Sequence, residues 1–188
     1  MDVNQRLTYL RELMQRERLG AFIFPSTDPH NSEYVADHWK CREWISGFNG
    51  SAGTAVVTMT NAALWTDSRY FIAAADQLKG TEYQLMKDGV DGTPTIAQWL
   101  GKQLQTTTNN TQRADSTEVA IDGSVVSAAA VERLIAELRR EGGLTLRTNF
   151  DPMSQIWTGR PAIPVNPVEL QPLEYAGKST HEKLDDIR

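Results

Sequence analysis

The sequence predicts an α/β fold in which a mixed β-sheet carries helices on both faces. Short apolar segments alternate along the chain with amphipathic segments of helical period, a pattern typical of a sheet covered by helices. Two neighbouring β-rich segments, 54–59 and 62–66, have only a short turn between them, so they predict an antiparallel hairpin within the sheet. The 188 residues suffice for one domain with a sizeable core.

The chain begins with a predicted amphipathic helix from about Asn4 to Arg18, with Gly20 as its stop. Its apolar residues recur at helical spacing: Leu7, Leu10, Leu13 and Met14. The apolar run 21–24 follows and ends at Pro25, which predicts a short buried strand.

The next stretch, to about Lys40, is rich in Asp, His, Ser and Asn, and predicts an irregular loop with a short helix near Tyr34 and Val35. After the hairpin, residues 68–78 predict a helix, and residues 82–86 alternate apolar and polar side chains as a strand does. The side chains expected to face inward from that helix are those of Tyr70, Ala73, Ala74 and Leu78.

A third helix is predicted to have Thr93 as its N-cap and Pro94 in its first position, and to run to about Leu104. Residues 119–121 then predict a strand.

Residues 127–140 predict a strong helix that ends at Gly142, and residues 144–146 predict the last strand. The apolar face of this helix consists of Val131, Leu134, Ile135 and Leu138.

The last part of the chain differs in composition from the rest. Four prolines exclude continuous regular structure and predict a stiff, extended linker: Pro161, Pro164, Pro167 and Pro172. Beyond it, Ser179 and Thr180 are candidate caps for a helix that starts at His181. We therefore predict one domain at 1–160, followed at 161–188 by a proline-rich linker and the start of the next domain of a longer protein.

Charge and composition exclude several classes of function. The chain has 19 Lys and Arg against 24 Asp and Glu, a net charge of −5, and no basic stripe, which argues against a nucleic-acid partner and an anionic membrane surface. No segment has the roughly 18 apolar residues of a membrane span, and the N-terminus lacks a signal-peptide core, so we expect a cytoplasmic protein. The single Cys41 excludes an internal disulfide and predicts an unreactive, half-buried thiol.

A glycine-rich segment, 47–54, precedes the hairpin, and a charged turn, 65–71, follows it. Glycine at every third position suits a backbone that needs positive φ or approaches another surface closely. The spacing is not Gly-x-Gly-x-x-Gly, and a β-rich run follows rather than a helix, so we do not expect phosphate binding. A hydrolase nucleophile elbow at Ser51 would need glycine at position 49, where Asn49 stands.

Metal-ligating residues are sparse. The chain has three histidines: His30, His38 and His181. None belongs to a His-Glu-x-x-His motif or a Cys/His cluster. His30 and His38 share a loop with three carboxylates, so a mononuclear metal site is one interpretation of that loop: Asp28, Glu33 and Asp37. The simpler interpretation is a solvated polar loop, because the spacing of these residues follows no defined helix.

Together these segments resemble the N-terminal domain of Xaa-Pro aminopeptidases (the aminopeptidase P family), which are relatives of creatinase and prolidase. The resemblance is carried by several motifs in one order along the chain: 25–34, 47–54, 65–71, 85–87, 93–95, 99–100 and 155–161. It covers nearly the whole chain, and the longer three-domain members are the most similar. One departure from the family is the polar stretch 106–111, which we expect to be a loop insertion without a catalytic role. It implies the creatinase/prolidase N-terminal fold, with a ribonuclease H-like motif.

The resemblance implies that the parent protein is a metallopeptidase that releases an N-terminal residue preceding proline. Two metal ions, expected to be Mn²⁺, would be held by a C-terminal domain. This chain would provide no catalytic residue, no metal ligand and no bound cofactor, and would support oligomerisation and substrate access. Its expected partners are the C-terminal domains of the same polypeptide, a second copy in a dimer, and a peptide with proline in second position.

Three residues are candidates for substrate binding, in trans to a neighbouring subunit: Arg69, Tyr70 and His30. The resemblance implies that the turn at 67–70 and the loop at 28–40 face that subunit's active site. Arg69 would offer a planar guanidinium to a carboxylate or peptide carbonyl. The alternative is a structural pair with Asp67 that only pins the turn.

Two further questions stay open at this level. Large aromatic side chains are usually buried, which favours a core position over a ligand contact for Tyr70 and Trp65, and Trp157 can pack on its own domain or on a neighbouring one. The rival function is a free-standing binding or interaction module without peptidase activity. The linker and the helix interrupted at Arg188 argue against it, and the reading frame beyond Arg188 would discriminate between the two.

Overall fold

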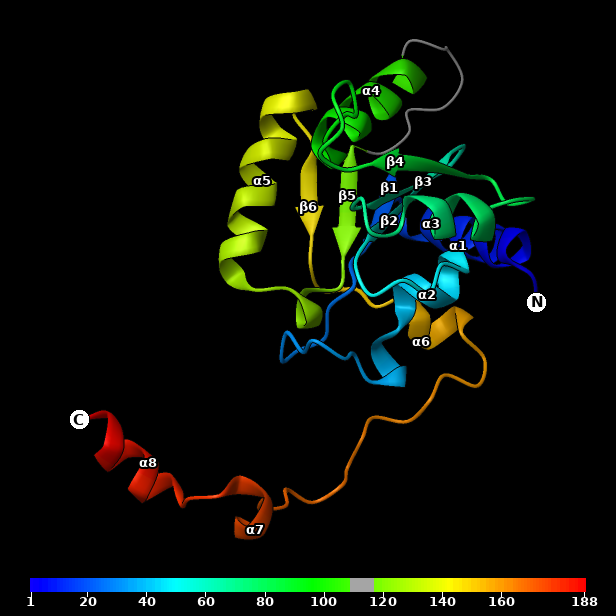
Figure 1. The fold of residues 1–188 in the computed structure, drawn as a ribbon. Helices are drawn as coiled ribbons and strands as arrows, with labels where there is room; N and C mark the ends of the chain where they lie inside the picture. The colour runs from blue at the N-terminus through cyan, green and yellow to red at the C-terminus, as the bar shows by residue number, and fades with distance from the viewer. Residues whose placement is uncertain (109–116) are drawn as a thin grey trace.

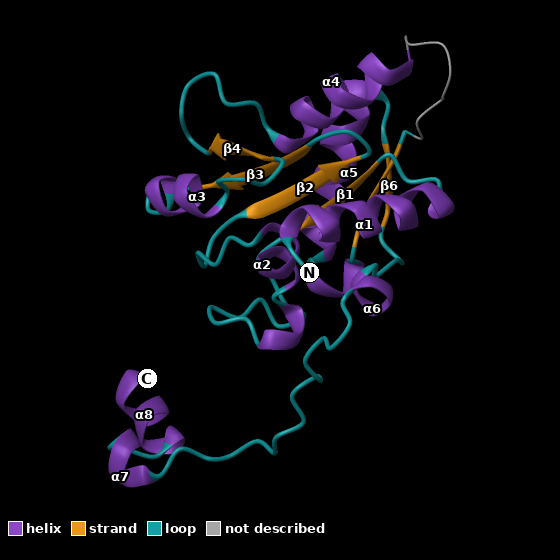
Figure 2. Cartoon of the chain, turned by 90° about the vertical axis from the view of Figure 1, so that its right-hand side faces the viewer, coloured by secondary structure: helices purple, strands orange, loops and turns teal. Residues whose placement is uncertain are grey.

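The computed structural model of the protein describes residues 1–108 and 117–188. Its body is a six-stranded sheet between two layers of helices (Figures 1 and 2). Residues 161–188 lead away from this body to the C-terminus in both views. The α/β class, the mixed sheet and the helices on both faces that the sequence predicts are confirmed.

The sheet contains all six predicted strands: β1 (Ala21–Phe24), β2 (Thr54–Thr58), β3 (Ala62–Thr66), β4 (Tyr83–Lys87), β5 (Glu118–Ile121) and β6 (Thr145–Arg147). Their order across the sheet is β4-β3-β2-β1-β5-β6. Strand β2 runs antiparallel to β1 and β3, whereas the other three neighbouring pairs are parallel. The predicted hairpin is therefore β2–β3, with Ala55 opposite Leu64.

The helices are α1 (Val3–Glu17), α2 (Cys41–Ser46), α3 (Phe71–Gln77), α4 (Ile96–Thr108), α5 (Ala128–Gly142), α6 (Met153–Ile156), α7 (Leu173–Ala176) and α8 (Thr180–Ile187). Figure 2 shows α4 on one side of the sheet and α1, α2 and α6 on the other. Helices α2, α6 and α7 were not predicted, because four to six residues are too few to display a helical period.

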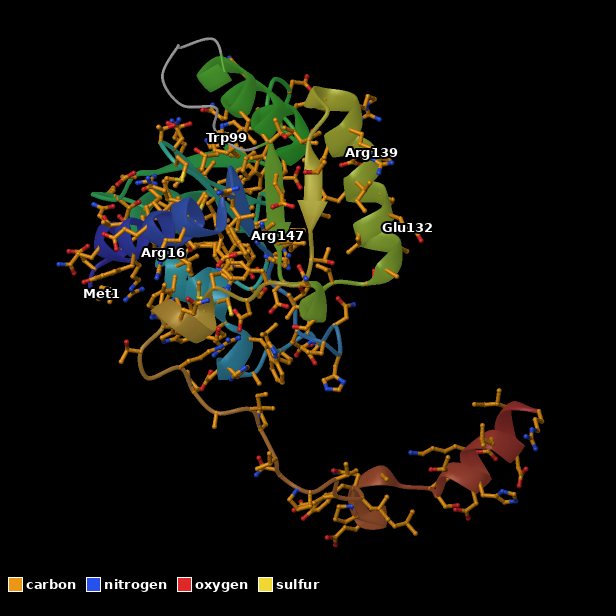
Figure 3. All side chains as sticks on the ribbon, turned by 180° about the vertical axis from the view of Figure 1, so that it is seen from behind. Met1, Arg16, Trp99, Glu132, Arg139 and Arg147 are labelled. Atoms are coloured by element: carbon orange, nitrogen blue, oxygen red, sulfur yellow. The ribbon has the colours of Figure 1, made fainter. Side chains whose placement is uncertain are left out.

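The sheet separates two apolar cores, because successive strand residues point to opposite faces. From β1, Phe22 and Phe24 join the core under α1, whereas Ala21 and Ile23 join the core under α4 and α5. The first core also receives apolar residues of α2, α3 and α6. In the second, Trp99 of α4, labelled in Figure 3, packs edge-on against Trp65 with ring centroids 5.6 Å apart.

The β6 edge of the sheet is tied to its neighbours by Arg147, which Figure 3 labels. Its guanidinium pairs with Glu118 of β5 and with Glu17 of α1, where Nη1 lies 3.0 Å from Oε2. Hydrogen bonds to the carboxylate of Glu118, and to a smaller extent to that of Glu17, raise the pKa of Arg147.

Several predicted helix ends were wrong: α3 begins at Phe71 rather than at residue 68, and α4 ends at Thr108 rather than at about Leu104. Helix α1 ends with Arg18, at φ 59°, as its C-cap rather than at Gly20. Helix α4 starts at Ile96, where Gln98 N donates to Thr95 Oγ1 (3.2 Å) and Thr95 N donates to Gln98 Oε1 (3.0 Å). The cap is therefore Thr95 rather than Thr93, because only Thr95 has a Gln three residues later to complete a capping box.

Three smaller predictions were also inaccurate. Ala73 is exposed on α3 instead of facing inward, whereas Ala74 and Leu78 are buried as predicted. The short helix expected near Tyr34 is a 3-10 turn at Asp37–Trp39. The insertion expected at 106–111 falls partly in α4, and its remainder lies outside the described residues.

The C-terminal segment is extended and then helical. Residues 161–172 form no regular structure, as the prolines predict. Helix α8 begins under a capping box in which Glu182 N donates to Ser179 Oγ (3.2 Å) and Ser179 N donates to Glu182 Oε2 (2.8 Å). The division of the chain at residue 160 stays a prediction.

No helix of the described residues has both the length and the apolar character needed to span a membrane.

Candidate functional site

The turn that carries two of the predicted site residues lies between β3 and α3. Asp67 closes it: its Oδ1 accepts a hydrogen bond from the backbone N of Arg69 (3.0 Å), and its carbonyl accepts one from the backbone N of Tyr70 (3.0 Å). An aspartate commonly bonds to the backbone two residues later in this way. The turn therefore presents Arg69 and Tyr70 side by side at the start of α3.

Arg69 makes the local pair that the sequence raised as an alternative. Its Nε donates to Asp67 Oδ1 (2.9 Å) and its Nη2 donates to Asp67 Oδ2 (2.8 Å). These bonds lower the pKa of Asp67 and raise that of Arg69. The side chain of Arg69 nevertheless stays 66% exposed, and its Nη1 bonds to no described residue. Arg69 is thus bonded to the turn through Nε and Nη2, while the rest of its guanidinium is exposed to solvent.

Tyr70 combines the two roles that the sequence left open. Its ring is half-buried and meets Phe48 edge-on, with centroids 5.9 Å apart. Its hydroxyl lies 2.7 Å from Ser51 Oγ, and this hydrogen bond lowers the pKa of Tyr70. The guanidinium of Arg69 lies over the same ring, 5.2 Å from its centroid. Trp65, by contrast, is a core residue, 6% exposed.

Both reasons given for the repeated glycines hold in the structure. Gly47 has φ +76° and ends α2. Gly50 packs under two rings, since a Cβ there would lie 2.3 Å from Phe48 Cζ and 2.7 Å from Tyr70 Cδ1. The glycine-rich segment is therefore shaped to pack against Tyr70.

Sequence reasoning missed Arg42, a buried arginine of α2 that is 5% exposed. Its Nε donates to Ser26 Oγ (2.9 Å), and its Nη1 and Nη2 donate to the carbonyls of Phe48 and Gly50. Burial lowers the pKa of Arg42 to about 10. Because α2 has only six residues, no period in the sequence marked position 42 as inward-facing.

A hollow of about 220 Å³ lies between the loop that follows β1 and the glycine-rich segment. Its lining includes Glu33, Trp39, Glu43 and Ser51. Glu33 is also close enough to Arg69 for its charge to help raise the pKa of that residue. The loop and the turn at 67–70 therefore lie on the same side of the molecule.

The third predicted site residue, His30, stands apart from the other two. It is exposed, and its backbone N donates to Asp28 Oδ1 (2.9 Å), as does that of Ser32 (3.0 Å). Burial alone would raise the pKa of Asp28, but the hydrogen bonds from Ser32 and His30 outweigh it and lower the pKa. No contact joins His30 to Arg69 or Tyr70 within the described residues.

The loop does not assemble the metal site that its composition raised as one interpretation. His38 turns to the C-terminal segment, where its Nδ1 lies 2.6 Å from the carbonyl oxygen of Pro161. Across residues 1–108 and 117–188, no group of three His, Cys, Asp or Glu side chains could hold a metal ion. The described residues therefore do not fit a metal centre.

The start of the C-terminal segment is fastened to α2. Arg160 pairs with Asp151 (Nη1–Oδ2 2.5 Å) and donates to Cys41 Sγ (3.5 Å), and Trp157 stacks on Trp44 with centroids 5.3 Å apart. Burial raises the pKa of the Cys41 thiol to about 12, so the thiol is protonated at neutral pH, as expected for an unreactive cysteine.

Comparison with known proteins agrees with this fold. A family model described as the creatinase/prolidase N-terminal domain matches residues 6–155. The chain belongs to this family. Over its whole length it is 42% identical to a protein of Talaromyces marneffei named as a probable Xaa-Pro aminopeptidase P, of which it covers 27%. The resemblance to the N-terminal domain of Xaa-Pro aminopeptidases that the sequence motifs predict is confirmed.

Solved structures give the same result. An X-prolyl aminopeptidase of Caenorhabditis elegans, described as a cytosolic enzyme with a di-nuclear active site, is 31% identical, with a TM-score of 0.80 over all of this chain and 30% of that one. A Streptococcus thermophilus Xaa-Pro aminopeptidase structure, 16% identical with a TM-score of 0.58, covers 83% of this chain and 98% of that one, and shows the shared fold alone. The chain thus spans less than a third of the fungal and nematode relatives.

Proposed function

We propose that this chain is the non-catalytic N-terminal domain of a cytoplasmic, metal-dependent Xaa-Pro aminopeptidase, with the domain body at 1–160 and the connection to the next domain at 161–188. The observation that carries the proposal is the similarity to an Xaa-Pro aminopeptidase P along the whole chain, combined with coverage of only 27% of that relative. The parent enzyme would release the N-terminal residue that precedes proline.

The catalytic centre is proposed to lie in another part of the parent polypeptide. The nematode relative is described as having a di-nuclear active site, whereas the described residues of this chain offer no metal-binding group. Hydrolysis with two metals requires several ligands that converge on ions about 3.5–4 Å apart. The two ions of the parent, expected to be Mn²⁺, would therefore be held by its C-terminal domains.

The role proposed for this chain is to support a dimer and to help bind the peptide in the active site of the second copy. Proline in second position has no N–H and restricts the residue before it, so the peptide needs a dedicated binding surface. Arg69 is suited to this role because its exposed guanidinium keeps Nη1 without a described partner. Tyr70 would contribute its ring, and His30 an exposed imidazole at the edge of the site.

The test compares the isolated chain with the full-length parent protein. Both are assayed for release of the N-terminal residue from a peptide with proline in second position, with Mn²⁺ added. We expect turnover by the parent and none by the isolated chain above a buffer blank. Turnover that coelutes with the purified chain would contradict the proposal. A reading frame that stops at Arg188 would favour the free-standing module instead.

A further inference from the structure

We propose that Arg42 is a positioning residue for peptide binding, which fixes the segment 48–53 and, through it, Tyr70 and Arg69. The inference rests on the proposed function, in which Arg69 and Tyr70 contact the peptide. Arg42 acts indirectly and does not bind the peptide itself, because each of its three nitrogens already donates to a group of the protein.

The first step leads from Arg42 to the near end of the segment 48–53. Two nitrogens of its guanidinium donate to the backbone of this segment, at the carbonyls of Phe48 and Gly50. The guanidinium also lies 4.9 Å from the centroid of the Phe48 ring. Arginine presents its donors in a rigid planar fork, whereas the ammonium of lysine is a single point, so this double contact depends on arginine.

The second step leads to the far end of the same segment. The Nε of Arg42 donates to Ser26 Oγ, and Ser26 Oγ donates in turn to the carbonyl of Gly53 (2.6 Å). Arg42 thus holds the segment at three points, two directly and one through a hydroxyl. Hydrogen bonds of this kind are costly to lose in a buried site, because the carbonyls would be left unpaired.

The third step leads from the segment to the predicted peptide-binding side chains. Gly50 lies directly against the ring of Tyr70, and Ser51 Oγ lies 2.7 Å from the Tyr70 hydroxyl. The ring of Tyr70 in turn lies under the guanidinium of Arg69. A displacement of the segment would therefore move the surface on which Arg69 rests. Misplaced binding groups would hold the peptide more weakly before and during the reaction, so the displacement should raise KM.

The experiment uses the full-length parent enzyme and measures kcat and KM for a peptide with proline in second position. The variants are Arg42→Lys, Ser51→Ala and Arg69→Ala, and the two doubles that combine Arg69→Ala with each of the others. Ser51 is exposed, so Ser51→Ala breaks the bond to Tyr70 without burying or exposing a core group. The exposed Arg16 of α1 provides the matched control Arg16→Lys.

We expect Arg42→Lys to raise KM about 5- to 20-fold and Ser51→Ala to raise it about 2- to 5-fold. In both variants kcat should change less than about 2-fold, because weaker positioning of binding groups acts on ground-state and transition-state binding alike. In the Arg69→Ala background each substitution should raise KM by a smaller factor than in the wild-type background, because the part of its effect that acts through Arg69 is already lost and only the part through Tyr70 remains. A residue that only supported the fold would add its effect in both backgrounds.

Two results would overturn the inference and leave the proposed function intact. The first is an unchanged KM in Arg42→Lys and Ser51→Ala while Arg69→Ala raises KM. The second is that each of the two substitutions raises KM by the same factor with and without Arg69→Ala. An Arg69→Ala enzyme with normal kcat and KM would instead contradict the proposed role of Arg69 itself. If Arg42→Lys fails to fold, Ser51→Ala alone and in the double with Arg69→Ala decides the matter by the same criterion.

Discussion

Arg42 and Arg69 lie at the two ends of one series of contacts, and their surroundings are opposite. Arg42 is 5% exposed and donates to neutral oxygens, whereas the side chain of Arg69 is 66% exposed and pairs with a carboxylate. Water can replace the partner of an exposed charge, but it cannot reach a buried one. We therefore expect substitution of Arg42 to act mainly on the stability of the fold, and substitution of Arg69 to act mainly on the proposed peptide binding.

The largest effect expected from this comparison is the loss of stability in Arg42→Ala. The substitution leaves the buried carbonyls of Phe48 and Gly50 without donors, and each such loss costs about 1–3 kcal/mol. We expect the free energy of unfolding to fall by about 2–4 kcal/mol, which is about 5–15 °C in Tm for a chain of this size. Thermal unfolding of the 188-residue chain measures it.

The control for that experiment is Arg16→Ala, which removes an exposed arginine from α1 and should leave Tm within about 1 °C. A similarly small change in Tm for Arg42→Ala would show that the buried hydrogen bonds contribute little to stability. The contrast between Arg42 and Arg69 would then not hold.

The second-largest effect concerns the packing at Gly50, which lies between Arg42 and Arg69 in the series of contacts. In Gly50→Ala the new Cβ would lie 2.3 Å from Phe48 Cζ and 2.7 Å from Tyr70 Cδ1, so both rings must shift, at a cost of about 1–3 kcal/mol. We expect lower Tm together with raised KM in the full-length enzyme. Gly143→Ala, at φ +64° in open space, is the matched control: it should lower Tm by backbone strain and leave KM unchanged. Equal KM values in both variants would contradict the packing argument.

The sequence was informative where interactions are local or periodic. The Asp67–Arg69 pair could be foreseen because its partners are only two positions apart, and α1 and α5 because each repeats its apolar residues over several turns. The contact of Ser51 with Tyr70, 19 residues apart, depends instead on how the chain folds. Arg42 was missed for a related reason, since its inward direction depends on a helix too short to show a period.

Helix ends show the same limit at smaller scale. Thr93-Pro94 carries the usual signal for a helix start, but the capping box with Gln98 places the start after Thr95. Near the C-terminus, Ser179 is the cap, one of the two predicted candidates, so that α8 begins at Thr180 rather than at His181, and Glu182 completes the capping box. A side-chain partner three residues on decided both cases.

The smallest expected effect is electrostatic. The hydrogen bonds from Arg69 lower the pKa of Asp67 below its usual 3.8, so the pair is fully formed above that pH and is lost as the pH falls through the lowered value. NMR titration of the Asp67 carboxyl should give a midpoint below 3.8 in the wild-type chain, moved upward toward 3.8 in Arg69→Ala. Identical midpoints in the two chains would show that the pair does not persist in solution.

The most direct test of the account measures kcat/KM and Tm together for Arg69→Ala in the full-length enzyme. We predict that kcat/KM falls about 5- to 100-fold, the usual effect of losing a charged hydrogen bond to a substrate, while Tm stays within about 1 °C. Arg139→Ala, on the exposed side of α5 in Figure 3, is the matched control and should change neither quantity. A strongly lowered Tm with normal kcat/KM in the folded fraction would contradict the account, and would show that Arg69 only stabilises its own turn.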